Sequence, residues 1–133
     1  MIPLVEKQYS VRTDPRGRAL SGLSMGGRHA LTIGLRHSEL FSHIGAFSAA
    51  VPDQETLEAT LPKAADINER LTLMWIACGR ADFLFQQNES LHAAFGKAGL
   101  RHEYRTTDGD HSWPVWRRYL ADFLPLLFQV PKR

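Results

Sequence analysis

The apolar run at residues 71–78 is the feature that most constrains how this chain can fold. All of its side chains except that of Thr72 are apolar. A strand that is apolar on both faces is typical of a parallel sheet, which helices cover on both sides. We therefore expect residues 71–78 to form a buried strand of a parallel sheet.

Segments of helix and strand character alternate on both sides of this run. In chain order we expect a short helix at residues 3–9, a strand at 18–23, a helix at 25–36, a strand at 43–50, a helix at 85–98, a strand at 102–106 and a helix at 113–128. Residues 52–70 are polar and are expected to be irregular, with one helix around residues 55–61. Gly99 and Pro125 are expected to end or kink the helices near them. The alternation predicts an α/β fold with about four parallel strands and flanking helices.

The composition is that of one ordinary globular domain, residues 1–133, with 44% hydrophobic and 23% charged residues. Basic and acidic residues are interspersed and the net charge is only +2, so the clustered basic face of a nucleic-acid-binding protein is not expected. No apolar stretch approaches the roughly 20 residues of a membrane span, and no membrane partner is expected. The first residues lack the apolar core of a secretory signal, which predicts a cytoplasmic protein if Met1 is the native start.

The motif Gly22-Leu23-Ser24-Met25-Gly26 follows the pattern GxSxG and lies between a predicted strand and a predicted helix. In that context a sharp turn would present the Ser24 hydroxyl at the top of the sheet. Glycines on either side would remove Cβ atoms that clash across the turn. The amide N–H of Met25 would then face an oxyanion at the serine. The structural alternative is a glycine-rich turn that only packs helix against sheet.

Two further polar residues follow the ends of other predicted strands. Asp82 follows the strand at 71–78, and His111 follows the strand at 102–106. Because the carboxyl ends of parallel strands share one edge of the sheet, we expect Ser24, Asp82 and His111 to meet there. A serine nucleophile needs a base, and the base needs an orienting acid. The sequence therefore predicts Ser24 as nucleophile, His111 as base and Asp82 as acid.

Alternatives remain for the acid and for the aromatic residues after the base. Asp108 and Asp110 are rival acids, although both lie too close to His111 in sequence to reach its ring easily from behind. Trp116 falls on the apolar face of the last helix and is expected to pack there, whereas Trp113 could line a substrate pocket or pack. The remaining histidines are expected to be surface or packing residues; they are His29, His37, His43, His92 and His102.

No metal or cofactor is expected. The histidines and acidic residues show no metal-ligand spacing, and catalysis by a serine, a histidine and an aspartate needs no cofactor. The one cysteine, Cys78, is expected to be a small buried residue in the strand at 71–78, because a single cysteine forms no internal disulfide.

Residues 18–27, 45–48, 78–83 and 111–117 together resemble the esterase D family of α/β-hydrolases. The family includes feruloyl and acetyl-xylan esterases, S-formylglutathione hydrolases and enterochelin-type esterases, and the histidine segment is also similar to that of the related mycolyltransferases. The resemblance extends from about Val5 to Phe128. It implies that Ser24 is the nucleophile, Asp82 the acid, His111 the base and Met25 one oxyanion donor.

The resemblance also implies that the chain corresponds to the C-terminal half of an α/β-hydrolase fold. The other half would supply a second oxyanion N–H and one wall of the substrate pocket. The function implied is a serine carboxylic-ester hydrolase that acts on a small-molecule ester through an acyl-serine intermediate. An acyltransferase with the same three residues is one alternative. A truncated, catalytically weak or silent domain with an assembly or binding role is the other.

The expected topology has a consequence for assembly. Right-handed crossovers between strands in sequential order place every connecting helix on one face of the sheet. The helix at 113–128 would cover the other face alone, leaving apolar side chains in water, and the strand at 18–23 would be a bare edge. We therefore expect a homodimer or higher oligomer. Its contact would be the half-covered face or the edge at 18–23, where a two-fold axis would pair the two copies antiparallel.

Overall fold

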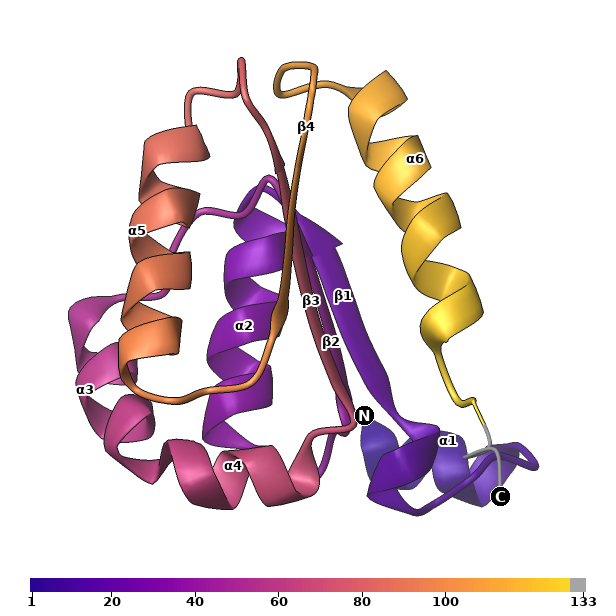
Figure 1. Cartoon of the computed structure of the whole chain (residues 1–133). Helices are drawn as coiled ribbons and strands as arrows, with labels where there is room; N and C mark the ends of the chain where they lie inside the picture. Colours follow the sequence, from indigo (N-terminus) through magenta and orange to yellow (C-terminus); the bar gives the residue numbers. More distant parts are fainter. Residues whose placement is uncertain (130–133) are drawn as a thin grey trace.

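The centre of the fold is a four-stranded parallel sheet, as the computed structural model, which describes residues 1–129, shows (Figure 1). The strands are β1 (Ala19–Leu23), β2 (His43–Phe47), β3 (Leu73–Gly79) and β4 (Glu103–Thr107). Their order across the sheet is β1-β2-β3-β4, so strands that follow one another in the chain are neighbours. The expected parallel α/β architecture is confirmed.

Helices lie on both faces of this sheet and beside one end of it. They are α1 (Ile2–Gln8), α2 (Met25–Arg36), α3 (Gln54–Thr60), α4 (Ala64–Arg70), α5 (Phe85–Lys97) and α6 (Trp113–Phe123), with 3₁₀ turns at Pro15–Gly17, Leu61–Lys63 and Leu124–Leu126. Figure 1 shows α2, α3 and α5 on one side of the sheet and α6 on the other. Right-handed crossovers between sequential parallel strands produce this one-sided distribution.

The segment between β2 and β3 differs in part from the sequence prediction. The helix expected around residues 55–61 is confirmed as α3, but the rest of the segment is not irregular, because a 3₁₀ turn and α4 follow it. The side chain of Asp53 caps α3 by accepting a hydrogen bond from the Thr56 N–H at 2.8 Å. Ala64 and Ile67 of α4 are buried in the core. The polar residues that suggested a loop are the solvent-facing sides of these short helices.

Two predicted elements end earlier in the structure than expected. Strand β2 stops at Phe47 because Ser48 adopts a positive φ of 46°, which no strand continues. Helix α6 stops at Phe123, and Pro125 lies in the 3₁₀ turn that follows. The expectation that Pro125 ends or kinks the last helix is therefore confirmed. Gly99, with a φ of 72°, follows the C-terminal end of α5 as predicted.

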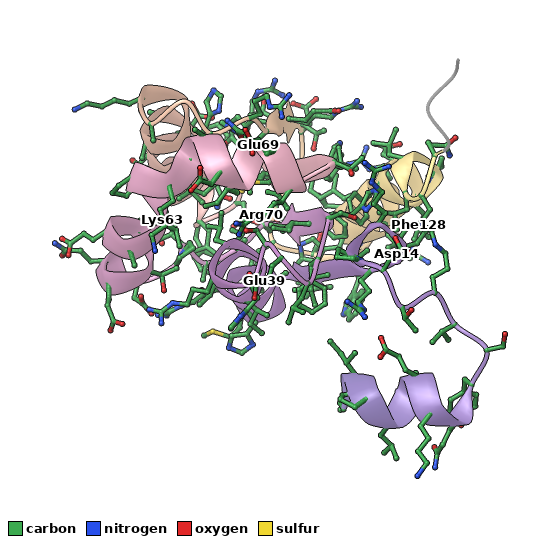
Figure 2. The ribbon with its side chains drawn as sticks, turned by 90° about the horizontal axis from the view of Figure 1, so that it is seen from below. Asp14, Glu39, Lys63, Glu69, Arg70 and Phe128 are labelled. Atoms are coloured by element: carbon green, nitrogen blue, oxygen red, sulfur yellow. The ribbon has the colours of Figure 1, made fainter. Side chains whose placement is uncertain are left out.

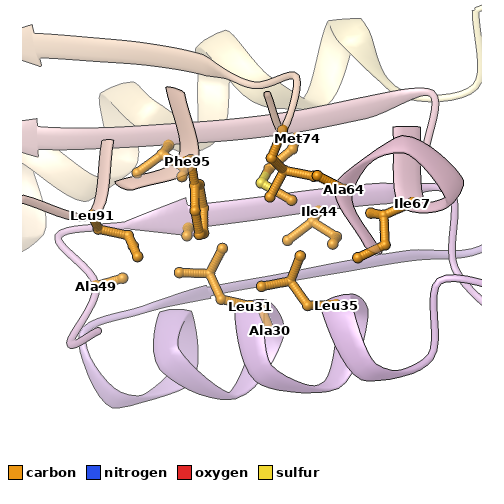
Figure 3. Close-up of a cluster of buried hydrophobic side chains, with 13 residues drawn as sticks. Ala30, Leu31, Leu35, Ile44, Ala49, Ala64, Ile67, Met74, Leu91 and Phe95 are labelled. Atoms are coloured by element: carbon orange, nitrogen blue, oxygen red, sulfur yellow. The ribbon is translucent and has the colours of Figure 1, made fainter. Parts of the chain in front are cut away.

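Two apolar clusters hold the helices to the sheet. The first lies between the sheet and the helices α2, α4 and α5, and it includes Leu31, Ile44, Met74 and Phe95 (Figure 3). The second lies under α6 and is aromatic; its largest members are Phe47, Trp75, Tyr119 and Phe123. The ring of Phe123 lies over Gly45, where an added Cβ would come within 2.7 Å of it. Both faces of the sheet are therefore packed.

The α6 face is better suited to water than the sequence suggested. Helix α6 packs on β2 and β3 in the middle of the sheet. On the edge strands this face presents the exposed Ser21 of β1 and the exposed Arg105 of β4. The Arg105 guanidinium lies 5.7 Å from the centre of the Trp75 ring and screens it. At these two positions the side chains in water are polar.

The two ends of the sheet differ in chemistry. Seen from below, the loops and helices at the end where the strands begin carry charged side chains of both signs, among them Glu39, Lys63, Glu69 and Arg70 (Figure 2). Helix α1 stands beside this end, and none of its residues is buried. Within residues 1–129, no helix has the length and apolar character needed to cross a membrane.

Candidate active site

The structure brings Ser24, Asp82 and His111 together at the C-terminal ends of the strands. Ser24 lies between β1 and α2, Asp82 between β3 and α5, and His111 between β4 and α6. The Nε2 atom of His111 lies 2.9 Å from the Ser24 hydroxyl oxygen. Its Nδ1 atom lies 2.9 and 3.1 Å from the two carboxylate oxygens of Asp82. The three side chains form one continuous hydrogen-bonded chain.

Ser24 occupies a strained turn that the end of β2 holds in place. Its φ of 53° and ψ of −119° are rare for a residue with a side chain, and such strain persists only where the surroundings enforce it. The Ser24 N–H donates to the carbonyl of Phe47 at 2.9 Å, and the Ser24 carbonyl accepts from the N–H of Ala50 at 3.1 Å. Hydrogen bonds from the N–H and to the carbonyl of Ser24 therefore hold the turn from which the hydroxyl projects.

The glycines around Ser24 do not all have the role expected of them. A Cβ on Gly22 would lie 2.3 Å from the carbonyl carbon of Gly26, so the elbow requires glycine there. A Cβ on Gly26 would meet nothing within 4 Å, and the expected clash at that position is wrong. The second close approach belongs to Gly27, whose Cβ would lie 2.6 Å from that of Ala49. Sequence reasoning missed Gly27, although the Gly26-Gly27 doublet marks it.

Asp82 is a fully buried carboxylate with a complete set of partners. Its side chain has 0% exposure. Besides the bonds to His111, its Oδ1 atom accepts from the N–H of Leu84 at 2.8 Å. The Asp82 N–H donates to the carbonyl of Gly79 at 3.1 Å, which fixes the turn. A buried charge is tolerated only with such partners, so the loop is built around the contact with His111.

Backbone hydrogen bonds tie the acid loop to the histidine loop. The N–H of Arg80 donates to the carbonyl of Thr107 at 2.8 Å, and that of Ala81 donates to the carbonyl of Gly109 at 3.0 Å. The loops approach so closely that a Cβ on Gly79 would lie 2.2 Å from the Gly109 carbonyl oxygen. This contact explains why two residues from different strands arrive at hydrogen-bonding distance.

The hydrogen-bond pattern assigns the tautomer of His111. Because Nδ1 faces a carboxylate, it carries the proton, and the lone pair of Nε2 then faces the Ser24 hydroxyl. A neutral imidazole in this orientation can accept a proton from the serine. The imidazole is also largely sheltered from solvent, with a side-chain exposure of 19%.

The rival acids lie elsewhere. The Asp108 carboxylate is fully exposed and pairs with Arg80 at 3.2 Å. Asp110 is exposed, and its backbone carbonyl accepts from the N–H of Ser112 at 3.0 Å. Asp82 is the carboxylate that the structure places against His111.

The other histidines are surface or packing residues, as expected. His29 and His37 are exposed and His43 is buried. His92 and His102 contact each other near the start of β4, with Nδ1 of the first 2.7 Å from Nε2 of the second.

Three aromatic side chains lie near His111. Trp116 is buried, as expected, with its ring 4.9 Å from the imidazole centre. Trp113 is 66% exposed, and its ring meets that of Trp116 edge-on at 5.3 Å. The alternative in which Trp113 packs under the last helix is therefore wrong. Phe83 is 74% exposed, and its ring centre lies 4.5 Å from that of His111. The sequence prediction missed Phe83, although it directly follows Asp82.

Cys78 is fully buried in β3, as expected. Burial, and then the negative charge of Asp82, raise the pKa of its thiol to about 12. Such a thiol stays protonated and unreactive. Among residues 1–129, no group of three or more His, Cys, Asp and Glu side chains is placed to hold a metal ion.

A comparison of the sequence with models of protein families gives one match that agrees with the Ser-His-Asp arrangement. The Esterase family, whose description reads "Putative esterase", matches residues 1–127. The chain belongs to this esterase family. The esterase fold observed here, four parallel strands with flanking helices, is also that of solved α/β-hydrolases, and the resemblance to feruloyl and acetyl esterases is confirmed.

Individual esterases align along nearly the whole chain. An acetyl esterase of Caldicellulosiruptor saccharolyticus is 28% identical, over 96% of this chain and 61% of the relative. An endo-1,4-beta-xylanase/feruloyl esterase of Xylanibacter ruminicola is 30% identical, over 97% of this chain and 17% of the relative. The ferulic acid esterase of Anaeromyces mucronatus, solved with ferulic acid, is 26% identical with a TM-score of 0.82, over 96% of this chain and 50% of that one. The chain thus spans about three fifths or less of the length of these relatives.

Proposed function

We propose that this chain is a serine carboxylic-ester hydrolase. The observation that carries the proposal is the hydrogen-bonded chain from the Ser24 hydroxyl through His111 to the buried Asp82 carboxylate. Membership of an esterase family supports the same reaction class. A strained serine turn and a buried carboxylate are both typical of a reacting site.

The geometry supports a two-step mechanism. Ser24 Oγ attacks the ester carbonyl carbon while His111 Nε2 takes the hydroxyl proton. The tetrahedral intermediate then collapses, and His111 returns the proton to the departing alcohol. Water attacks the resulting acyl-serine with His111 again as base, and the carboxylic acid leaves as Ser24 regains its proton. Asp82 holds the Nδ1–H and stabilises the imidazolium in both steps.

Met25 is the proposed oxyanion donor. It is the first residue of α2 and directly follows the nucleophile. The first N–H groups of a helix have no partner within it and lie at the positive end of its dipole. The Met25 amide therefore suits a negative oxygen that develops beside Ser24.

Small-molecule esters are the proposed substrates, because the similar proteins are named for acetyl and ferulic acid esters. Trp113 is the proposed substrate contact. Its ring is largely exposed, and it meets Trp116, which in turn lies against His111. We propose no cofactor, because each proton and each bond in the mechanism is handled by the three side chains and water.

One observation favours a second candidate, a weakly active or silent domain with a binding role. The chain spans about three fifths or less of the esterases to which it is similar. If a second oxyanion donor lies in the part that these relatives have in addition, its loss would lower the rate by about 10²–10³-fold.

Hydrolysis of p-nitrophenyl acetate by the purified chain separates the two candidates. We expect turnover that Ser24→Ala lowers by about 10³-fold or more, because the nucleophile is lost while the fold is kept. Circular dichroism of both proteins controls for folding. Equal rates for the two folded proteins would contradict the esterase proposal and favour the silent domain.

We also propose that the chain self-associates through β1. This strand pairs with β2 alone among the described residues, and an unpaired strand edge is a template for another strand. Two-fold pairing of two β1 strands would be antiparallel and would join two sheets into one. We expect light scattering to show twice the mass of the chain at micromolar concentration. A monomer whose mass is independent of concentration would contradict this assembly.

A further inference from the structure

Two aromatic rings from different elements lie against His111. Phe83, in the turn before α5, lies 4.5 Å from the imidazole centre with an angle of 48° between the ring planes. Trp116, on α6, meets the imidazole at 4.9 Å and 89°. Trp116 is buried and belongs to the aromatic cluster under α6. Phe83 is 74% exposed, so ordinary core packing does not account for its position.

The backbone on both sides of Phe83 is held firmly. Its neighbours Asp82 and Leu84 are buried, with exposures of 5% and 7%. The Asp82 side chain accepts from the Leu84 N–H, and the Asp82 carbonyl accepts from the Phe85 N–H at 3.0 Å. The turn therefore presents the Phe83 ring outward from a fixed base, and His111 is the aromatic neighbour that this ring contacts.

We propose that Phe83 is a positioning residue that covers one face of the His111 imidazole and shelters its bond to Asp82. The role rests on the proposed serine mechanism. Between Phe83 and Trp116 the imidazole has little freedom to turn about its χ angles, so Nε2 stays aimed at Ser24. The ring also limits the access of water to the Nδ1–H that Asp82 holds.

The contact also places an aromatic ring beside the imidazolium that forms during the reaction. When His111 takes the serine proton, the imidazolium faces an aromatic ring at 4.5 Å, which is within the range of a cation–π interaction. Phe83 thus acts through His111, without a bond to the reacting atoms.

Proton NMR of the free protein tests this role without any need for turnover. We expect the Nδ1–H of His111 to give a low-field signal that is absent from His111→Ala. In Phe83→Ala this signal should exchange with water about two- to tenfold faster, since the loss of one aromatic pair corresponds to a factor of that size. Phe83→Tyr restores the ring and should restore the slow exchange.

Two further variants serve as controls. Phe83→Leu keeps an apolar side chain without a ring and should show intermediate exchange, which keeps the test valid if Phe83→Ala folds poorly. Tyr9→Ala removes another aromatic side chain, 65% exposed, from the N-terminal segment and should leave the signal unchanged. In the esterase assay, Phe83→Ala should lower kcat by about two- to fivefold with little change in KM, and Phe83→Tyr should recover it.

Several results would overturn the role of Phe83. They are an exchange rate in Phe83→Ala equal to that of the wild type, a failure of Phe83→Tyr to restore slow exchange, and the absence of a low-field signal from the wild-type protein. A failure of the proposed function gives a different result. In that case the wild type still shows the slowly exchanging signal, but the protein does not hydrolyse esters and Ser24 does not react.

Discussion

Asp82→Asn is expected to lower kcat/KM for p-nitrophenyl acetate by about 10⁴-fold. The asparagine has nearly the same shape as the aspartate, but its amide group donates where the carboxylate accepts. Opposite an amide donor, His111 Nδ1 would become the acceptor and its proton would move to Nε2. That nitrogen would then face Ser24 with a proton instead of a lone pair, so it could not act as base.

The matched controls for this variant are Asp108→Asn and Asp110→Asn. Both carboxylates are exposed, and neither is bonded to His111 in the structure. Because surface charges contribute little, we expect both controls to stay within about threefold of the wild type. A larger loss in Asp110→Asn than in Asp82→Asn would show that the acid is assigned to the wrong residue.

Gly22→Ala is expected to disrupt the serine turn, whereas Gly26→Ala is not. A Cβ at Gly22 would press on the backbone of Gly26, at 2.3 Å from its carbonyl carbon, so the turn itself would have to move. We expect a loss of about 3 kcal/mol in the free energy of unfolding, the upper range for an overpacked site. Esterase activity should fall by about 10²-fold, because a shift of about 1 Å in a reacting atom has that effect.

Urea unfolding followed by circular dichroism, run beside the esterase assay, compares the two glycines. At Gly26 an added Cβ has open space, and alanine is a better helix former than glycine in the first turn of α2. Gly26→Ala should therefore be as stable as the wild type or more stable by up to about 1 kcal/mol. Equal losses in the two variants would contradict the steric account of the turn.

The parallel α/β architecture could be predicted from the sequence because the patterns that indicate it lie within short segments. The apolar run that became β3 and the Gly-Ser-Gly turn after β1 both have patterns that few other structures produce. Once the strands are parallel, the rule that their carboxyl ends share one edge brings Ser24, Asp82 and His111 together. The meeting of these side chains followed from topology, without any contact being known beforehand.

The missed features depend on contacts between distant segments. Helix α4 is short and carries only Ala64 and Ile67 as buried residues, too few for a clear helical period. Gly27 is required because Ala49 approaches it from the loop after β2, and Phe83 matters because His111 arrives from β4. The local sequence can mark such a position, as the Gly26-Gly27 doublet does, but it does not show which distant segment approaches it. The same holds for the α6 face, where Arg105 of β4 lies beside Trp75 of the neighbouring strand β3.

Labelling with a fluorophosphonate probe is the most direct test of the central claim, that Ser24 is a nucleophile activated by His111. The probe forms a covalent bond only with a serine whose hydroxyl is deprotonated as it attacks. We predict a single adduct per folded chain, located on Ser24 by peptide mass spectrometry, and none on Ser24→Ala. No adduct on the folded wild-type protein, or an equal yield on Ser24→Ala, would contradict the account.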